Sequence, residues 1–432
     1  MSKLLYLLAT LFLASWANGV RAQSEERRAL SIEELFALAD SNNRSIMVAA
    51  TAVDAAEENA RIASNARLPS VDVSLSLSYN GNGSITDRNF RNSFVAPIPH
   101  FGNSFSLEAS QVIFAGGAIR SGMRIAELQW QLAALDMERN RQEARFLIAS
   151  NYLELCRLQN SSKVLGRNIA VTRQVLDNMR RRSSEGMALQ NDVTRYELLL
   201  QNLSYDSIHL QNAISLTNNQ LTVAVGLPSS IVIVPDSDGI EFEAGPEIDI
   251  FEALPVQIAQ KSEEIARHAE KTSRAERLPQ VALFVGDYLN GPVTIEIPAL
   301  DKNFNYWVAG VGVKYNFGAL YKSGAKIRAS QLAAKRAAEE KAVAEERVAL
   351  AAEAAQTHYR EAFALLETKL KSVELAVQNY DVVSRRYANG LALIADLLDA
   401  SAQRLDAELQ AVDAQINIIY NYYKIKYIAG TL

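Results

Sequence analysis

The sequence predicts an α+β membrane protein that consists mostly of long α-helices and has four transmembrane β-strands in each chain. Three observations support this fold class. The chain contains an internal tandem repeat, it has two very long segments without proline, and it has segments in which apolar and polar residues alternate. Because a repeat of this kind repeats a structural unit, the elements expected in one half are also expected in the other.

The first residues predict export. Lys3 precedes an apolar run from Leu4 to Trp16, and small residues follow it, which is typical of a cleaved secretory signal peptide at residues 1–22. The run is too short to span a membrane as a helix. We therefore expect the mature chain to begin near residue 23.

The repeat is visible in short matching segments. Arg67-Leu68-Pro69 recurs as Arg277-Leu278-Pro279, and Gly186-Met187-Ala188-Leu189 recurs as Gly390-Leu391-Ala392-Leu393. The predicted organisation is a first repeat at 23–226 with a hairpin at 70–114, a linker at 227–248, and a second repeat at 249–432 with a hairpin at 279–317. The linker is rich in proline, glycine and acidic residues, so we expect it to run along the outside of the helices.

Each half should contain one helix before its hairpin and a very long helix after it. Ser31 and Glu34 form a capping box, and no proline or glycine interrupts the chain from there to Leu68, which predicts a single helix. Residues 118–185 and 319–389 contain no proline. At 1.5 Å per residue each could extend roughly 100 Å, a length typical of helices packed side by side.

Strict alternation of apolar and polar residues at 71–79 predicts a strand with one apolar face, and 105–114, 281–289 and 306–317 are its expected partners. Their lengths suit tilted strands in an outer membrane. Four strands cannot close a sheet, and an open edge in lipid leaves backbone groups unpaired. Two copies would give about eight strands and three about twelve, and composition does not choose between them. A soluble hairpin pair on a helical bundle remains an alternative.

Composition argues against several function classes. The net charge of -5 does not suggest nucleic-acid binding. Cys156 is the only cysteine and is expected to be a packed thiol. The four histidines lie in no metal-ligand pattern, and the many acidic pairs single out no catalytic dyad. We therefore expect no catalytic residues, no metal, no cofactor and no enzymatic activity.

The arrangement of helix, hairpin and long helix, twice over, resembles the TolC family of outer-membrane efflux proteins. The most specific matches are Tyr387-Ala388-Asn389-Gly390, Asp396-Leu397-Leu398-Asp399-Ala400 and Gly430-Thr431-Leu432. The resemblance implies a homotrimer whose twelve strands form one β-barrel in the cell outer membrane, in contact with its lipid. It also implies a helical barrel that extends into the periplasm.

The resemblance also suggests site residues. Asp396 and Asp399 match acidic rings at the family's periplasmic constriction, which would attract cations. Asp192 and Tyr387 match positions in the bonds that close the coiled coils, and Arg195 is a further candidate for these contacts. Ala392 stands where studied members carry an arginine, so Arg195, Arg385 or Arg386 would have to take its place.

The turns between the long helices are the other predicted site. Gly186 and Gly390 should form the turns, and Met187 and Leu391 should mark where an adaptor protein docks. The expected function is a passive exit duct of a tripartite efflux pump, with a periplasmic adaptor and an inner-membrane pump, either a proton-driven exporter or a transport ATPase, as partners. A type I protein secretion duct is the main alternative, and a structural envelope coiled coil is a further one. The substrate is not readable from the sequence.

Overall fold

The computed structural model describes residues 26–235 and 248–432, which form two compact units. The helical unit contains the described residues up to Val48, those of Glu138–Ala253, and Arg347–Leu432. The sheet unit contains Ala49–Met137 and Leu254–Glu346. Each unit takes segments from both sequence repeats, so the predicted repeat boundaries stay a prediction. The predicted signal peptide and most of the predicted linker lie outside the described residues.

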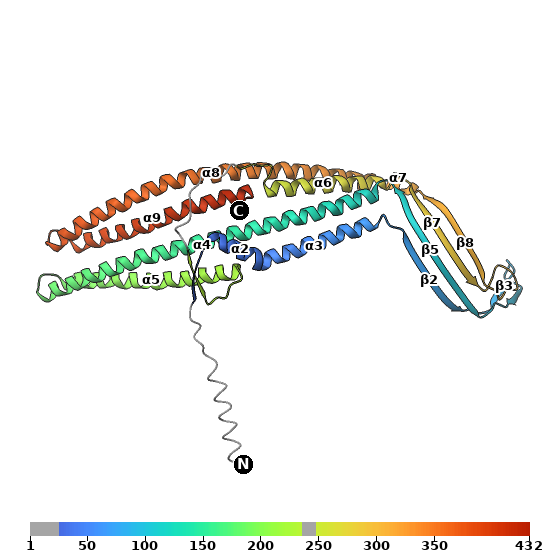
Figure 1. Ribbon diagram of the computed structural model, residues 1–432, viewed down its shortest axis with the longest axis horizontal. Helices are drawn as coiled ribbons and strands as arrows, with labels where there is room; N and C mark the ends of the chain where they lie inside the picture. Colours follow the sequence, from blue (N-terminus) through green and yellow to red (C-terminus); the bar gives the residue numbers. More distant parts are fainter. Residues whose placement is uncertain (1–25, 236–247) are drawn as a thin grey trace, which may run out of the picture. The chain divides into compact units, whose positions relative to one another are not determined.

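Long helices dominate the described chain, as the sequence predicted. In the helical unit, α5 (Gln190–Ala224) lies beside α4 (Ala118–Ser184), and α9 (Ile394–Ala429) lies beside α8 (Gly324–Ala388) (Figure 1). Both α4 and α8 also contribute residues to the sheet unit. Within residues 26–235 and 248–432, no helix combines the length and the apolar composition that a bilayer-spanning helix requires.

The core of the helical unit includes a short parallel strand pair that the sequence did not predict. β1 (Glu26–Leu30) pairs with β6 (Ile231–Pro235), and Ile233 of β6 is fully buried. The Asn218 side chain holds β6 in place, because its Nδ2 donates to the Ile231 carbonyl (2.8 Å) and its Oδ1 accepts from the Ile233 amide (2.8 Å). The expectation that the linker runs along the outside is therefore wrong for residues 231–235.

Charged and thiol groups in the same unit are fixed by packing. Asp40 accepts hydrogen bonds from Arg141 (3.0 Å) and Arg145 (3.2 Å), and Arg145 also donates to the Leu432 carbonyl (2.9 Å). Burial alone would raise the pKa of Asp40, but the hydrogen bonds and charges of the two arginines outweigh it and lower that pKa. Cys156 is buried, as predicted, and burial raises the pKa of its thiol to about 12.

The first helix of the first half is interrupted where the sequence predicted continuity. The single helix expected from Ser31 to Leu68 is wrong, because α2 (Ile32–Asn42) ends before α3 (Arg44–Asn65) begins. Asn43 between them is extended, and its Oδ1 accepts from the Ser45 amide (2.9 Å), which caps α3. Its Nδ2 donates to the Ala224 carbonyl (2.8 Å). One amide side chain therefore starts α3 and joins the break between the two helices to α5.

The long segment of the second half is divided in a similar way. The expected helix from residue 319 to 389 appears as α7 (Phe317–Lys322) and α8, with Ser323 between them. The buried Ser323 hydroxyl accepts a hydrogen bond from Arg277 (2.7 Å). Arg277 lies in the sequence just before the second hairpin. The start of α8 is therefore tied to the strands of the sheet unit.

The sheet unit contains the predicted four-stranded sheet. Its order is β2 (Ser70–Tyr79), β5 (Phe101–Ala115), β7 (Gln280–Gly291) and β8 (Phe304–Lys314), and every neighbouring pair is antiparallel. A small hairpin of β3 (Gly83–Thr86) and β4 (Ser93–Ala96) lies at the end of the sheet away from the helices (Figure 1). α6 (Leu254–Ala275) precedes β7.

The register gives the sheet two chemically different faces. Val71 faces Ala109, Val285 and Ala309 in one row across the strands, and Leu75 shares the same face with Phe105. The apolar side chains of β2 are more than half exposed in the chain. On the other face, Ser74 and Ser106 share a hydrogen bond (2.9 Å). Asp287 and Asn305 also lie on the apolar face, which is therefore most complete over β2. A mostly apolar exposed surface of this kind needs another apolar phase to cover it.

Candidate functional site

Each pair of long helices in the helical unit is joined by a turn built on one glycine. Gly186 and Gly390 have φ angles of 76° and 71°, which few other residues adopt easily. The Met187 amide donates to the Arg182 carbonyl (2.8 Å), and the Leu391 amide makes the equivalent bond to Arg386 (2.8 Å). The predicted turns are therefore present as glycine-terminated helix ends.

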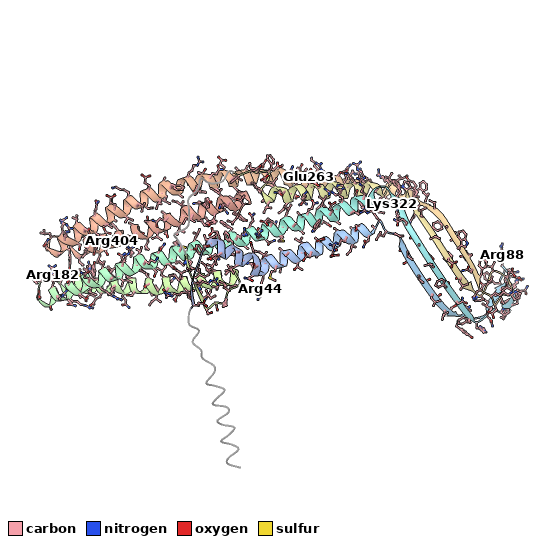
Figure 2. All side chains as sticks on the ribbon, in the orientation of Figure 1. Arg44, Arg88, Arg182, Glu263, Lys322 and Arg404 are labelled. Carbon is pink, nitrogen blue, oxygen red and sulfur yellow. The ribbon has the colours of Figure 1, made fainter. Side chains whose placement is uncertain are left out.

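The two turns present apolar side chains to their surroundings. Met187 is 60% exposed and Leu391 is 67% exposed. Arg182 lies at the same end of α4 (Figure 2). An exposed apolar residue on a rigid turn, with arginine beside it, is suited to contact another protein.

A compact apolar cluster lies just behind the turns and involves all four long helices. We call it the tip core; it contains Leu176 and Met179 of α4, Val193 and Tyr196 of α5, Tyr380 of α8, and Ile394, Leu397 and Ala400 of α9. These buried residues fix the two turns relative to each other within one chain. The sequence analysis missed this cluster, although the spacing of three residues between its members on α4, α5 and α9 is the pattern that indicates such a helix face.

A hydrogen bond beside the tip core joins two residues that the sequence analysis paired. The Tyr387 hydroxyl at the end of α8 donates to Asp192 Oδ2 in the first turn of α5 (3.4 Å). Burial, followed by the negative charge of Asp192, raises the pKa of Tyr387. The phenol therefore stays protonated at neutral pH and acts as the donor. The bond is long, so it is weak, and it connects the two helix pairs.

The second predicted pair, Asp396 and Asp399, lies on the exposed face of α9. Asp396 accepts from the Leu393 amide (3.0 Å) and so caps the helix, and Asp399 accepts from Gln403 Nε2 (2.7 Å). Leu397 and Ala400 point the other way, into the tip core. Both carboxylates are therefore held beside the turn and directed away from the chain's own core.

Arg195 is not brought to the other predicted closing residues. Its side chain is exposed, and among the described residues it makes no ion pair with Asp192. Arg386 donates to the Leu391 carbonyl (3.4 Å) in its own turn. The role suggested for Arg195 therefore stays a prediction.

A network of polar contacts behind the tip core was not predicted from the sequence. The Arg404 guanidinium lies 5.0 Å from the centre of the Tyr380 ring and 2.9 Å from Glu408. Glu408 also accepts from Asn168 of α4 (2.9 Å). The charge on Arg404 thus links α8, α9 and α4, and Figure 2 shows Arg404 on α9. These residues are distant from one another in the sequence, so no local motif predicts their contacts.

Comparison with known proteins finds a matching family. A model of the family described as outer membrane efflux protein matches residues 35–227. This match lies almost entirely within the first predicted repeat and agrees with the family that the sequence predicted. Proteins of this family are channels of the cell outer membrane that extend into the periplasm, which agrees with the location predicted from the sequence.

Solved structures of outer membrane channels share the fold of this chain. The Vibrio cholerae outer membrane protein VceC is 16% identical with a TM-score of 0.79, and the match covers 92% of this chain and 96% of that protein. The open state of the Neisseria gonorrhoeae channel MtrE is 16% identical with a TM-score of 0.76, covering 92% and 88%. The Campylobacter jejuni channel CmeC is 14% identical with a TM-score of 0.76, covering 93% and 85%. No curated protein matches the chain.

Proposed function

We propose that this protein is the exit duct of a tripartite pump, a passive conduit formed by a homotrimer. An adaptor and an inner-membrane pump would open it at the periplasmic end. The observation that carries the proposal is the four-stranded sheet, which has one mostly apolar exposed face and, among the described residues, two edge strands without a partner, β2 and β8.

The edges of the sheet support an assembly of several copies. The backbone groups on the outer sides of β2 and β8 lack strand partners among the described residues. In lipid each unpaired group costs several kcal/mol, so pairing β8 of one copy with β2 of the next is strongly favoured. Three copies would give about twelve strands, enough to surround a lumen, whereas about eight strands enclose an interior that side chains fill.

The residues at the turns support a gated entrance. Asp396 and Asp399 are exposed and adjacent on one helix face, so three copies around an axis would place six carboxylates together. Such a ring attracts cations and repels anions. The bond between Tyr387 and Asp192 is one of the contacts between the helix pairs, and its loss would favour their separation. Met187 and Leu391 supply the surface for the adaptor.

Cysteine crosslinking between the edge strands tests the trimer. In a Cys156→Ala background, one cysteine replaces Ser74 on β2 and a second is moved along β8 in successive variants. We expect an oxidised species three times the mass of the chain for at least one pair. A control with both cysteines on the central strands β5 and β7 should crosslink only within a chain. Crosslinked species that continue beyond three chains, or monomers for every cysteine pair, would refute the trimer.

Transport in cells tests the function separately from the assembly. We expect the chain, expressed in a host that lacks its own exit duct together with the cognate adaptor and pump, to lower the accumulation of a fluorescent dye such as ethidium. If the trimer leaves dye accumulation unchanged but restores export of a secreted protein, the efflux function is refuted and the secretion duct is supported.

A further inference from the structure

The sheet unit contains a large pocket that the duct function does not explain. It has a volume of about 1590 Å³ and lies where β5 passes into α4, with walls from α3 and α6. We call it the junction pocket. Every residue that lines it belongs to the sheet unit, so its geometry depends on that unit alone.

The junction pocket is strongly basic. Among the described residues, six cationic side chains line it and two carboxylates do, those of Glu57 and Glu127. The cationic residues are Arg61, Arg67, Arg120, Arg124, Lys271 and Arg274. An excess of positive charge inside a concave wall raises the local concentration of anions.

Three of these cations already have acidic partners. Arg61 pairs with Glu57 (2.6 Å), Arg124 pairs with Glu127 (2.9 Å), and Arg274 pairs with Glu270 (2.6 Å). These pairs contribute little to the field that a ligand would meet.

The other three cations lack such a partner. In the part of the chain that the structure describes, no carboxylate lies within ion-pair distance of Arg67, Arg120 or Lys271. They come from the turn after α3, the start of α4 and the last turns of α6, so three separate segments bring uncompensated charge to one pocket.

A histidine on the wall has an unsatisfied atom. His268 Nδ1 is buried and makes no hydrogen bond within the described residues. Burial, followed by the charges of Lys271 and Arg124, lowers the pKa of His268. The ring is therefore neutral at neutral pH and can form a hydrogen bond with a ligand or a water molecule. Buried polar atoms without partners are uncommon in folded proteins, so this atom offers a hydrogen-bonding position to a ligand or a water molecule in the pocket.

The pocket also has an apolar wall, which a simple anion would not need. Ile113 and Phe114 at the bulge of β5, Met123 and Trp130 of α4, and Leu278 before β7 line it. Ile113 and Phe114 are about half exposed. Arginines beside an indole and aliphatic side chains match a molecule with an anionic head and an apolar tail.

We propose that the junction pocket binds a phosphate-bearing amphiphile, with its phosphate among Arg67, Arg120 and Lys271 and its apolar part against Trp130 and Phe114. The pocket lies at the helix end of the sheet, which is the membrane segment of this outer membrane protein, so head groups of the membrane's own phospholipids reach this level. An amphiphilic cargo carries the same chemistry. The inference requires the location of the protein but not the pump assignment.

Fluorescence of Trp130 in the purified oligomer tests the proposal. Trp307 on β8 is replaced by Phe, so that Trp130 is the reporter in the chain after signal peptide removal. The probes are dihexanoyl phosphatidylglycerol below its micelle concentration and inorganic phosphate, both in a non-ionic detergent. We expect a saturable change with the lipid, partial competition by phosphate, and an affinity at least about tenfold lower in Arg120→Gln with Lys271→Gln, because charge-assisted hydrogen bonds are lost.

The control carries the same change of charge outside the pocket. Lys322→Gln with Arg328→Gln alters two exposed cations of the same unit, and Figure 2 shows Lys322 on α7. We expect it to bind like the parent. Equal affinity in the pocket variant and the control would overturn the site. If phosphate binds as tightly as the lipid, the apolar part of the ligand contributes nothing and the proposal of an amphiphilic ligand is refuted.

The source of the ligand is read from the same preparations. Phospholipid that copurifies with the parent oligomer and the control, but not with the pocket variant, assigns the site to membrane lipid. Binding of added lipid without any copurified phospholipid assigns it to a diffusible amphiphile. Both outcomes support the proposed site, and both are measured by mass spectrometry of the extracted oligomer.

Discussion

Replacement of Tyr387 by phenylalanine should loosen the closed entrance while the fold stays intact. The substitution removes only the hydroxyl that donates to Asp192 at 3.4 Å. A hydrogen bond to a charged group contributes about 1.5–3 kcal/mol, and the length and partial exposure of this one reduce the expected value to about 1 kcal/mol. An equilibrium changes tenfold for every 1.4 kcal/mol, so the ratio of open to closed tips should rise about fivefold in each chain.

Planar-bilayer recordings measure this ratio as the open probability of single channels. The matched control is Ser183→Ala, because Ser183 precedes Gly186 by the same three residues that separate Tyr387 from Gly390. Its hydroxyl contacts Gln190 (3.4 Å) in its own turn and joins no other helix pair. An open probability that is unchanged in Tyr387→Phe, or raised equally in Ser183→Ala, would show that the bond does not hold the entrance closed.

Three further predictions concern other parts of the chain. Asp396→Ala with Asp399→Ala should abolish cation selectivity and block by multivalent cations in bilayer recordings, and unchanged selectivity would exclude a carboxylate ring. Leu75→Arg on the apolar face of β2 should cost about 2–4 kcal/mol and reduce outer membrane assembly, whereas Ser76→Arg on the opposite face should assemble normally in fractionation experiments. The lowered pKa of Asp40 contributes stability that is present above the pKa of the unfolded chain, about 3.9, and is lost as the pH falls through the folded value. The melting temperature should therefore fall below about pH 4. Asp40→Asn should have a lower melting temperature at pH 7, and that temperature should fall less below pH 4.

Much of the architecture could be predicted because it depends on local periodicity. The strand at 71–79 alternates with period two over its whole length and appears as β2, and the long segments without proline appear as long helices. The break at Asn43 could not be predicted in this way. Its cause is a hydrogen bond to Ala224, a residue of a different helix, and asparagine within a helical pattern does not signal that partner.

The site shows the same division. Gly186 and Gly390 could be found from sequence because a helix end with positive φ requires a particular residue type at one position. The exposed position of Asp399 follows from its spacing relative to Leu397 and Ala400, which are buried. The junction pocket depends on three basic residues, one from the turn after α3, one from α4 and one from α6, and only the assembled sheet unit brings them together. Because these residues are far apart in the sequence, no local pattern predicts the junction pocket.

The strand pair of β1 and β6 has a consequence for how this protein matures. The core of the helical unit joins Leu30, Ile233 and Leu432, which lie near the beginning, the middle and the end of the described chain. Contacts between such distant residues form slowly, because a long loop must close before they are made. An exported chain enters the periplasm progressively, and its early segments wait there, with apolar surface uncovered, for residues that arrive last. Maturation of this protein should therefore depend strongly on periplasmic chaperones.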